Sequence, residues 1–281
     1  MTKCHSRFCF EYEFYFALFD KINQATKIML FAEIQQKIKY AKQLDFGNLL
    51  NESIELFKKV WLQGLLMLLI IFAFVIPFMI VIYVPMVFFS IADTESPGFF
   101  GGWEAIAVIF FVTACLLFVF IMLVVTFGLK VGLFRIMRQK DMGIIGKDDY
   151  FFFLRKPYLS KTINLSLAYF GISLLAMLLC MFPLIYVMVP LNLLVVMYAF
   201  NPEISNSNLI KASFDLGNKK WFITFGITLV AGFMAQMVGM LMCGIGILAT
   251  ASFAAIPLYL IYKEVIGFDE DVAELKQIGN D

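Results

Sequence analysis

Four long stretches of the chain contain no Asp, Glu, Lys or Arg, and they constrain its fold more than any other feature. They span Val60–Ala92, Ala105–Leu129, Thr162–Pro202 and Trp221–Tyr262. A helix needs about 20 apolar residues to cross about 30 Å of hydrocarbon. The first two stretches can therefore each hold one spanning helix, and the last two can each hold two. The composition agrees, with 62% hydrophobic residues, 15% charged residues and a mean hydropathy of +0.86.

Each of the two longer stretches is interrupted near its middle. Met181-Phe182-Pro183 divides the third, and Cys243-Gly244-Ile245-Gly246 divides the fourth. These residues end helices or permit turns. The sequence therefore predicts an all-α polytopic membrane bundle, with six transmembrane helices over residues 45–266 and with cytoplasmic interfacial helices. Residues 1–44 form a cytoplasmic N-terminal segment in this prediction, and residues 267–281 form a cytoplasmic tail.

The distribution of positive charge predicts how the bundle is oriented. Of the 22 Lys and Arg residues, nine precede the first span, eight lie between the second and third, three between the fourth and fifth, and two after the sixth. All of them fall on one side of the predicted membrane, and cytoplasmic loops are the ones that carry such an excess. The pattern predicts a multi-pass membrane protein with both termini in the cytoplasm. Lys130, at the cytoplasmic end of the second span, is expected to reach the interface.

The N-terminal segment allows two interpretations. Phe8, Phe10, Tyr12, Phe14 and Phe16 alternate with other residues, which is a period of two. One interpretation is a segment that lies on the membrane surface or binds a partner. The other is that translation naturally begins at Met29.

A helical pattern becomes clear from Asp45 onward. Apolar residues recur there at spacings of three and four, which places them on one helical face: Phe46, Leu49, Leu50, Ile54, Phe57 and Trp61. Such a helix would lie at the cytoplasmic interface and continue into the first span. Ser53-Ile54-Glu55-Leu56 resembles Ser213-Phe214-Asp215-Leu216, and both are followed by two lysines and a tryptophan. Three repeats of an interfacial helix and a helical hairpin would explain this, but any hairpin that enters from the cytoplasm also acquires basic and aromatic flanks.

Few residues in the spans are candidates for a functional site. The polar side chains predicted to lie deep in the bundle are Asn192, Gln236 and a scatter of serines and threonines. They could coordinate a polar solute, or they could form hydrogen bonds between helices, and the second interpretation is favoured. No ionisable residue lies at the depth of the hydrocarbon, which argues against a transporter coupled to protons through buried carboxylates.

Small residues mark faces where helices are expected to pack closely. Gly128 and Gly132 form a Gly-x-x-x-Gly motif at the end of the second span. A second stripe, with a spacing of four residues along the fifth span, consists of Ala231, Ala235, Gly239 and Cys243. Close approach of backbones supplies the contacts that hold helices together in lipid. A partner helix within the same chain is favoured over another subunit.

Enzyme chemistry, cofactors and metals have little support in the sequence. Cys4, His5 and Cys9 are too few ligands for a closed zinc site. His5 is the one histidine, so dyads at membrane depth that use His are excluded. Neither a Gly-x-Ser-x-Gly elbow nor a Walker loop occurs. We therefore predict no catalytic residue, no cofactor and no metal.

Three motifs are similar to those of a known family: Leu44-Asp45-Phe46-Gly47-x-x-Leu50-Asn51, Pro183-Leu184-Ile185-Tyr186 and Lys219-Lys220-Trp221-Phe222. From about residue 42 onward the chain resembles a family of uncharacterised six-helix membrane proteins found especially in Bacteroidota. It is more distantly similar to the membrane domain of some glycerophosphodiester phosphodiesterases. Some members of such families carry a beta-carotene monooxygenase label. That enzyme class holds iron with four histidines, which this chain does not have.

Three functions remain open from the sequence. The first, which we favour, is a non-catalytic accessory or scaffold protein whose basic cytoplasmic helices contact anionic lipid headgroups or a membrane-protein partner. The second is a transporter or channel for a small or lipidic solute, and the third is a membrane-bound enzyme that acts on lipid. The net charge of +1 gives no indication of nucleic-acid binding.

Overall fold

A computed structural model describes residues 26–95, 104–179, 182–242 and 246–268 of the chain. Over these residues it contains helices, turns and loops but no strand, and six helices are long and apolar enough to cross a membrane. The prediction of an all-α polytopic helix bundle is confirmed. In chain order the elements are a helix over residues 26–39, α2 (Phe46–Glu95), α3 (Glu104–Asp141), η1 (Phe152–Leu154), α4 (Leu159–Leu178), α5 (Phe182–Phe200), α6 (Asn206–Lys219), α7 (Trp221–Leu241), α8 (Gly246–Thr250), η2 (Ala251–Ala255) and α9 (Ile256–Val265).

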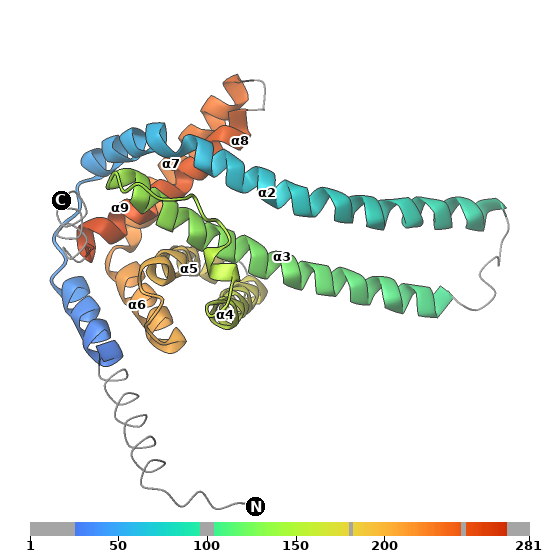
Figure 1. Cartoon of the computed structure of the whole chain (residues 1–281), viewed down its shortest axis with the longest axis horizontal. Helices are drawn as coiled ribbons and strands as arrows, with labels where there is room; N and C mark the ends of the chain where they lie inside the picture. The colour runs from blue at the N-terminus through green and yellow to red at the C-terminus, as the bar shows by residue number, and fades with distance from the viewer. Residues whose placement is uncertain (1–25, 96–103, 180–181, 243–245, 269–281) are drawn as a thin grey trace, which may run out of the picture.

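The spanning helices pair as three hairpins. The first is α2 with α3, the second is α4 with α5, and the third is α7 with the segment Gly246–Val265. Figure 1 shows the hairpins leaving a common region in different directions: α2 and α3 run to the right, α7 and α8 rise to the top, and α4 is seen almost end-on. Within a bilayer each spanning segment satisfies its backbone hydrogen bonds internally as a helix, and a short connection between two such helices gives a hairpin. The predicted threefold repeat of an interfacial helix and a helical hairpin in the amino-acid sequence stays a prediction.

The first helix is longer than a membrane requires. α2 has 50 residues and would be about 75 Å long at 1.5 Å per residue, more than twice the thickness of the hydrocarbon. Asp45 caps its N-terminus, since the Asp45 carboxylate accepts a hydrogen bond of 2.7 Å from the Asn48 amide. The predicted interfacial helix and the first span are therefore one continuous helix.

The second helix continues past the predicted end of its span. The charge-free stretch ends at Leu129, whereas α3 ends at Asp141. The additional turns carry Arg138 and Lys140 in the last turn of the helix, where positive side chains complement the negative end of the helix dipole. The additional turns of α3 after Leu129 pack in the hydrophobic core of the protein.

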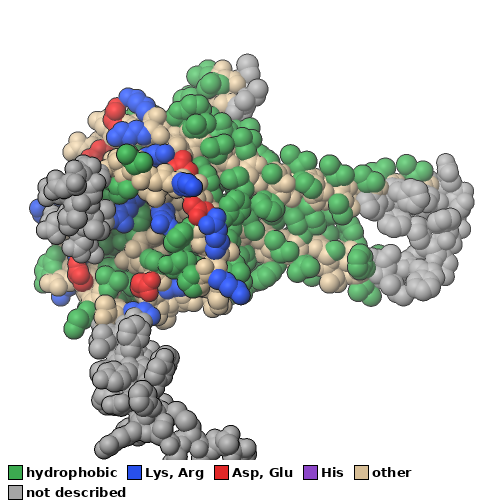
Figure 2. Space-filling model, in the orientation of Figure 1, with side chains coloured by type: hydrophobic (Ala, Val, Ile, Leu, Met, Phe, Trp, Pro, Cys, Tyr) green, Lys and Arg blue, Asp and Glu red, His purple; other side chains and the backbone are tan. Residues whose placement is uncertain are grey.

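Charged side chains gather at one end of the molecule, which we call the charged end. Figure 2 shows Lys, Arg, Asp and Glu around the left of the view and hydrophobic side chains over the α2–α3 hairpin. In the most apolar stretches of α2 and α3 only 6% of residues are buried, against 56% in α5 and 61% in Gly246–Val265. α5 and the last span are therefore the centre of the packing, and the first hairpin extends away from it.

The amphipathic helix α6 packs against α5. The Ser205 hydroxyl caps it by accepting a hydrogen bond of 3.3 Å from the Asn208 amide. A Cβ atom added at Gly217 would lie 2.9 Å from the Pro190 Cα atom, so the two helices can approach this closely because residue 217 has no side chain. Pro190 lies inside α5 and lacks an amide hydrogen, so residue 190 donates no hydrogen bond to the preceding turn of the helix.

Candidate functional site

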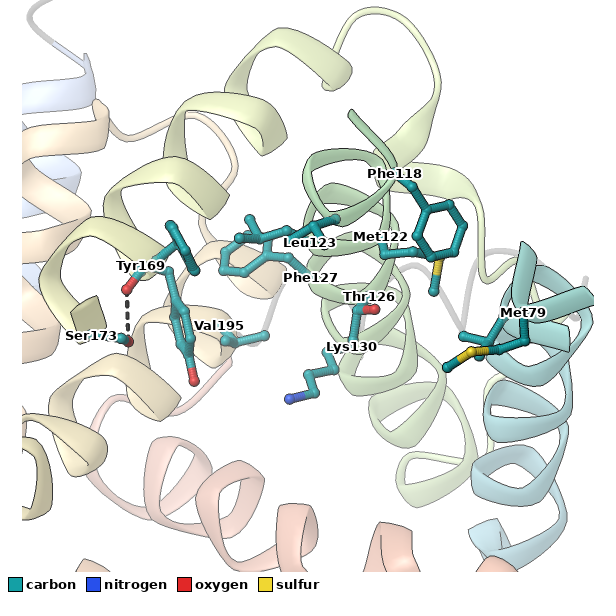
Figure 3. A pocket seen from close by; sticks show the side chains of 13 residues that line it. Met79, Phe118, Met122, Leu123, Thr126, Phe127, Lys130, Tyr169, Ser173 and Val195 are labelled. Carbon is teal, nitrogen blue, oxygen red and sulfur yellow. Dashed lines mark hydrogen bonds between the residues drawn. The ribbon is translucent and has the colours of Figure 1, made fainter. Parts of the chain in front are cut away.

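A cavity with a mostly apolar lining has a volume of about 510 Å³ and lies between the α2–α3 hairpin and the α4–α5 hairpin. Figure 3 shows its walls, to which α2 contributes Met79, α3 contributes Phe118 and Phe127, and α4 contributes Tyr169. Almost all of its lining side chains are apolar. A volume between about 300 and 1,000 Å³ is usual for sites that bind small ligands. The cavity is therefore suited to a hydrocarbon chain.

Lys130 is the one charged residue among those that line this cavity. It lies on α3, and in Figure 3 its ammonium group extends from the helix into the space between α3 and Val195 of α5. Within the described residues Lys130 forms no ion pair and no hydrogen bond. Lys130 is exposed in the absence of lipid, and the side chains that line the cavity around it are mostly apolar. Once such a site is in a membrane, an ammonium ion there is unfavourable unless an anion accompanies it. The cavity thus combines an apolar wall with a cation that has no partner.

A second cavity, of about 270 Å³, also has Lys130 and Val195 in its lining. It differs from the first because Asn192, Thr228 and Ser252 give it polar groups. The hydroxyl oxygens of Thr228 and Ser252 are buried and have no hydrogen-bond partner in the described structure. Buried hydroxyls usually do have a partner. The arrangement can therefore accept a polar group in the smaller cavity, an anion at Lys130 and an apolar chain in the larger cavity.

The two amides singled out from the sequence do not share a site. Asn192 lines the smaller cavity, whereas Gln236 is exposed on α7 and lines neither cavity. Neither amide forms a hydrogen bond with another described residue. The two amides therefore lie in different surroundings, Asn192 at a cavity and Gln236 on the exposed face of α7, and a role for either one stays a prediction.

The glycine motif of α3 contacts a loop instead of a spanning helix. A Cβ atom added at Gly132 would lie 2.6 Å from the Tyr150 carbonyl oxygen, and one added at Gly128 would lie 2.6 Å from the Leu154 side chain. The Tyr150 hydroxyl donates a hydrogen bond of 3.0 Å to the Gln63 carbonyl on α2. Burial and the Asp148 carboxylate raise the pKa of Tyr150 to about 12. The segment before α4 is therefore held against both helices of the first hairpin.

The small-residue stripe of α7 packs against the next helix of the same chain. Ala231, Ala235 and Gly239 are buried. The Thr250 hydroxyl donates a hydrogen bond of 2.8 Å to the Ala235 carbonyl, and a Cβ atom at Gly239 would lie 2.7 Å from the Ile247 backbone nitrogen. Cys243, like Cys4, His5 and Cys9, lies outside the described residues.

Sequence reasoning assigned Lys130 to the interface and missed its place between two cavities. The available signal was its isolation, since Lys130 is the first charged residue after the stretch Ala105–Leu129 and the next is Arg135. The polar lining of the smaller cavity had no such signal, because Thr228 and Ser252 come from distant parts of the chain.

Comparisons of this chain with known protein families, with curated proteins and with solved structures found no match.

Proposed function

We propose that this chain is a non-catalytic membrane accessory or scaffold protein that binds an anionic amphiphile, such as a lipid with an acidic headgroup. The observation that carries the proposal is Lys130, which has no partner among the described residues and lies at the junction of an apolar and a polar cavity. The anionic group would pair with Lys130, an acyl chain would occupy the larger cavity, and a polar substituent would occupy the smaller one.

The energetic reason is the environment of the ammonium group. An ion pair gains strength where water is scarce, because the effective dielectric constant is low. At the same time an unpaired charge is costly there. Burial of each methylene of an acyl chain contributes about 0.8 kcal/mol. An anionic amphiphile both pairs with the ammonium group and fills the apolar cavity with its acyl chain. A small inorganic anion pairs with the ammonium group but leaves the apolar cavity empty.

The experiment measures which lipids the protein retains. The full chain would be purified in mild detergent, and its bound lipids would be identified by native mass spectrometry. Lys130→Met keeps the length of the side chain and removes its charge. We expect this variant to lose the bound anionic lipid while its helical content stays unchanged.

Lys147→Met is the matched control, because Lys147 is exposed in a loop and lines neither cavity. It should retain the lipid as the wild type does. Equal retention by both variants would refute the site, and so would the absence of any anionic amphiphile from the wild-type protein.

The proposal includes an orientation. With the charged end in the cytoplasm of a bacterial cell, the N- and C-termini would lie inside and the protein would belong to the inner membrane. Anionic headgroups of the cytoplasmic leaflet would be partners of the basic helices, and a membrane protein could be another. In a cysteine-free background, an impermeant thiol reagent added outside should label Ser96→Cys but leave Lys147→Cys unmodified.

A transporter of a lipidic solute is the second candidate. It is favoured by one observation, namely that two cavities share Lys130 and Val195 in their linings. Reconstitution into liposomes would separate the two functions, since a transporter moves a labelled amphiphile between leaflets and a scaffold only retains it. The resemblance to the six-helix family is compatible with either function and stays a prediction.

A further inference from the structure

A third cavity, of about 290 Å³, lies at the charged end of the molecule. Its walls come from four segments that are distant in sequence: the helix over residues 26–39, the end of α3, the end of α5 with Asn201, and the segment after α9 up to Phe268. It shares no lining residue with the two cavities at Lys130. Arg138 and Lys130 are eight residues apart on α3, a separation of about 12 Å along the helix. The third cavity is thus a separate site.

Arg138 is the central side chain of this cavity. Its guanidinium carbon lies 4.4 Å from the ring centroid of Phe268 and 6.0 Å from that of Phe200. Its Nε atom is buried and has no hydrogen-bond partner, and no described carboxylate pairs with the guanidinium group. A guanidinium group has five N–H donors and stays charged at any physiological pH. The aromatic rings hold the guanidinium group in place through cation–π contacts. They leave its N–H donors free for an acceptor such as an oxyanion.

The rest of the lining shows how the chain builds this surface. Gly267 has a φ angle of +75°, and its amide donates a hydrogen bond of 3.2 Å to the Tyr262 carbonyl, which is the left-handed ending common for helices. This turn places Phe268 over Arg138. The Asn201 amide donates a hydrogen bond of 2.7 Å to the Tyr262 hydroxyl and so fixes the opposite wall.

The charge balance in the cavity favours an anion. Lys37 and Glu33 form an ion pair of 2.8 Å on one helix and offset each other. The lining residues therefore carry a net charge of one positive unit, which belongs to Arg138. Asp141, one turn further on α3, is engaged by Tyr259 at 2.8 Å and Lys263 at 2.7 Å rather than by Arg138.

We propose that this cavity binds a phosphate group through Arg138. The planar fork of an arginine matches two oxygens of a phosphate, and such charge-assisted hydrogen bonds are the strongest that side chains form. The volume leaves room for a small organic group attached to the phosphate. The phosphate could belong to a lipid headgroup or to a soluble phosphate ester, because both present the same oxygens.

The test measures phosphate binding by the full chain. In the first arm, glycerol 3-phosphate is titrated into the detergent-purified protein in an isothermal calorimeter. In the second arm, the protein is reconstituted in nanodiscs with phosphatidic acid or with uncharged diacylglycerol as the added lipid, and lipid enrichment around the protein is measured. We expect saturable binding in at least one arm and a weakening of about tenfold or more in Arg138→Met.

Arg135→Met is the matched control. Arg135 lies on the same helix and also stacks on an aromatic ring, at 3.6 Å from the Phe152 centroid, but it does not line this cavity. It should bind phosphate like the wild type. Lys37→Gln, a change at a side chain that is 36% exposed, adds a variant with little risk to folding and should weaken binding less than Arg138→Met.

Binding in the first arm identifies a soluble phosphate ester. Enrichment of phosphatidic acid in the second arm alone identifies a lipid headgroup at Arg138 when Arg138→Met still lowers the enrichment in a Lys130→Met background, which lacks the proposed amphiphile site. Absence of binding in both arms overturns the proposal, and so does equal weakening in Arg138→Met and Arg135→Met. Lys130→Met should leave phosphate binding at Arg138 unchanged, so failure of the proposed amphiphile site and failure of this one give different results.

Discussion

The close contact between α3 and the loop before α4 leads to a quantitative prediction for Gly132→Ala. The new Cβ atom would lie 2.6 Å from the Tyr150 carbonyl oxygen and 3.2 Å from its carbonyl carbon. Ordinary contacts of a Cβ atom begin at 3.4 Å, so the backbone of the loop would have to move. Overpacking of this kind costs about 1–3 kcal/mol, which outweighs the gain of about 0.5–1 kcal/mol from replacing a helical glycine by alanine.

Two other glycines act as internal references. Gly171 on α4 has no atom within 4 Å of an added Cβ, so Gly171→Ala should raise the free energy of unfolding by the propensity gain alone. Gly128→Ala should fall between the two, because its added Cβ meets the Leu154 side chain, which can rotate away. A symmetric helix–helix contact through Gly128 and Gly132 would instead make both substitutions equally costly.

The free energies of unfolding would be measured in mixed micelles with increasing SDS, with circular dichroism as the signal. The expected order of stability is Gly171→Ala, then the wild type, then Gly128→Ala, then Gly132→Ala. If Gly132→Ala unfolds at the same SDS fraction as Gly171→Ala, the loop does not lie on α3 as described, and the packing argument fails.

Three further predictions concern polar groups at the charged end. Thr162→Val should lower the free energy of unfolding by about 1–3 kcal/mol, because the buried hydroxyl bonds the Phe153 carbonyl at 2.8 Å, and SDS titration would measure the loss. The pKa of Tyr150 is raised to about 12 in the folded protein, whereas an unfolded tyrosine has a pKa of about 10. The free energy of unfolding should therefore fall as the pH rises from 10 to 12, and it should fall less in Tyr150→Phe. Asp141→Asn should cost about 1–3 kcal/mol, since it leaves the Lys263 ammonium without its anion at 2.7 Å, and a melting curve that matches the wild type would contradict this.

Much of the helix layout could be predicted from local sequence. The charge-free stretches, the breaks before Phe182 and before Gly246, and the start of a helix after Asp45 all agree with the structure. Each of these features depends on residues close together in the chain, such as a capping carboxylate or a proline in the first turn. The continuation of α3 to Asp141 was missed, because charged residues end a span but do not end a helix.

The candidate sites were far less accessible to sequence reasoning. Asn192 and Gln236 were paired because both are polar and deep, yet one lines a cavity and the other is exposed. Arg138 was not singled out, since its environment depends on Phe268, which is 130 positions away in the chain. A side chain's sequence neighbours say little about which distant surface it meets.

The sequence by itself determined that the chain crosses a membrane and which stretches cross it, because the bilayer acts on every apolar stretch of sufficient length in the same way. Only the tertiary structure decided how the hairpins meet. Between helices in lipid there is no hydrophobic drive, so the outcome depends on the fit of particular surfaces such as Gly239 of α7 on the Ile247 backbone of α8. That fit leaves Lys130 between two cavities and Arg138 beneath Phe268, and both proposals begin from those positions.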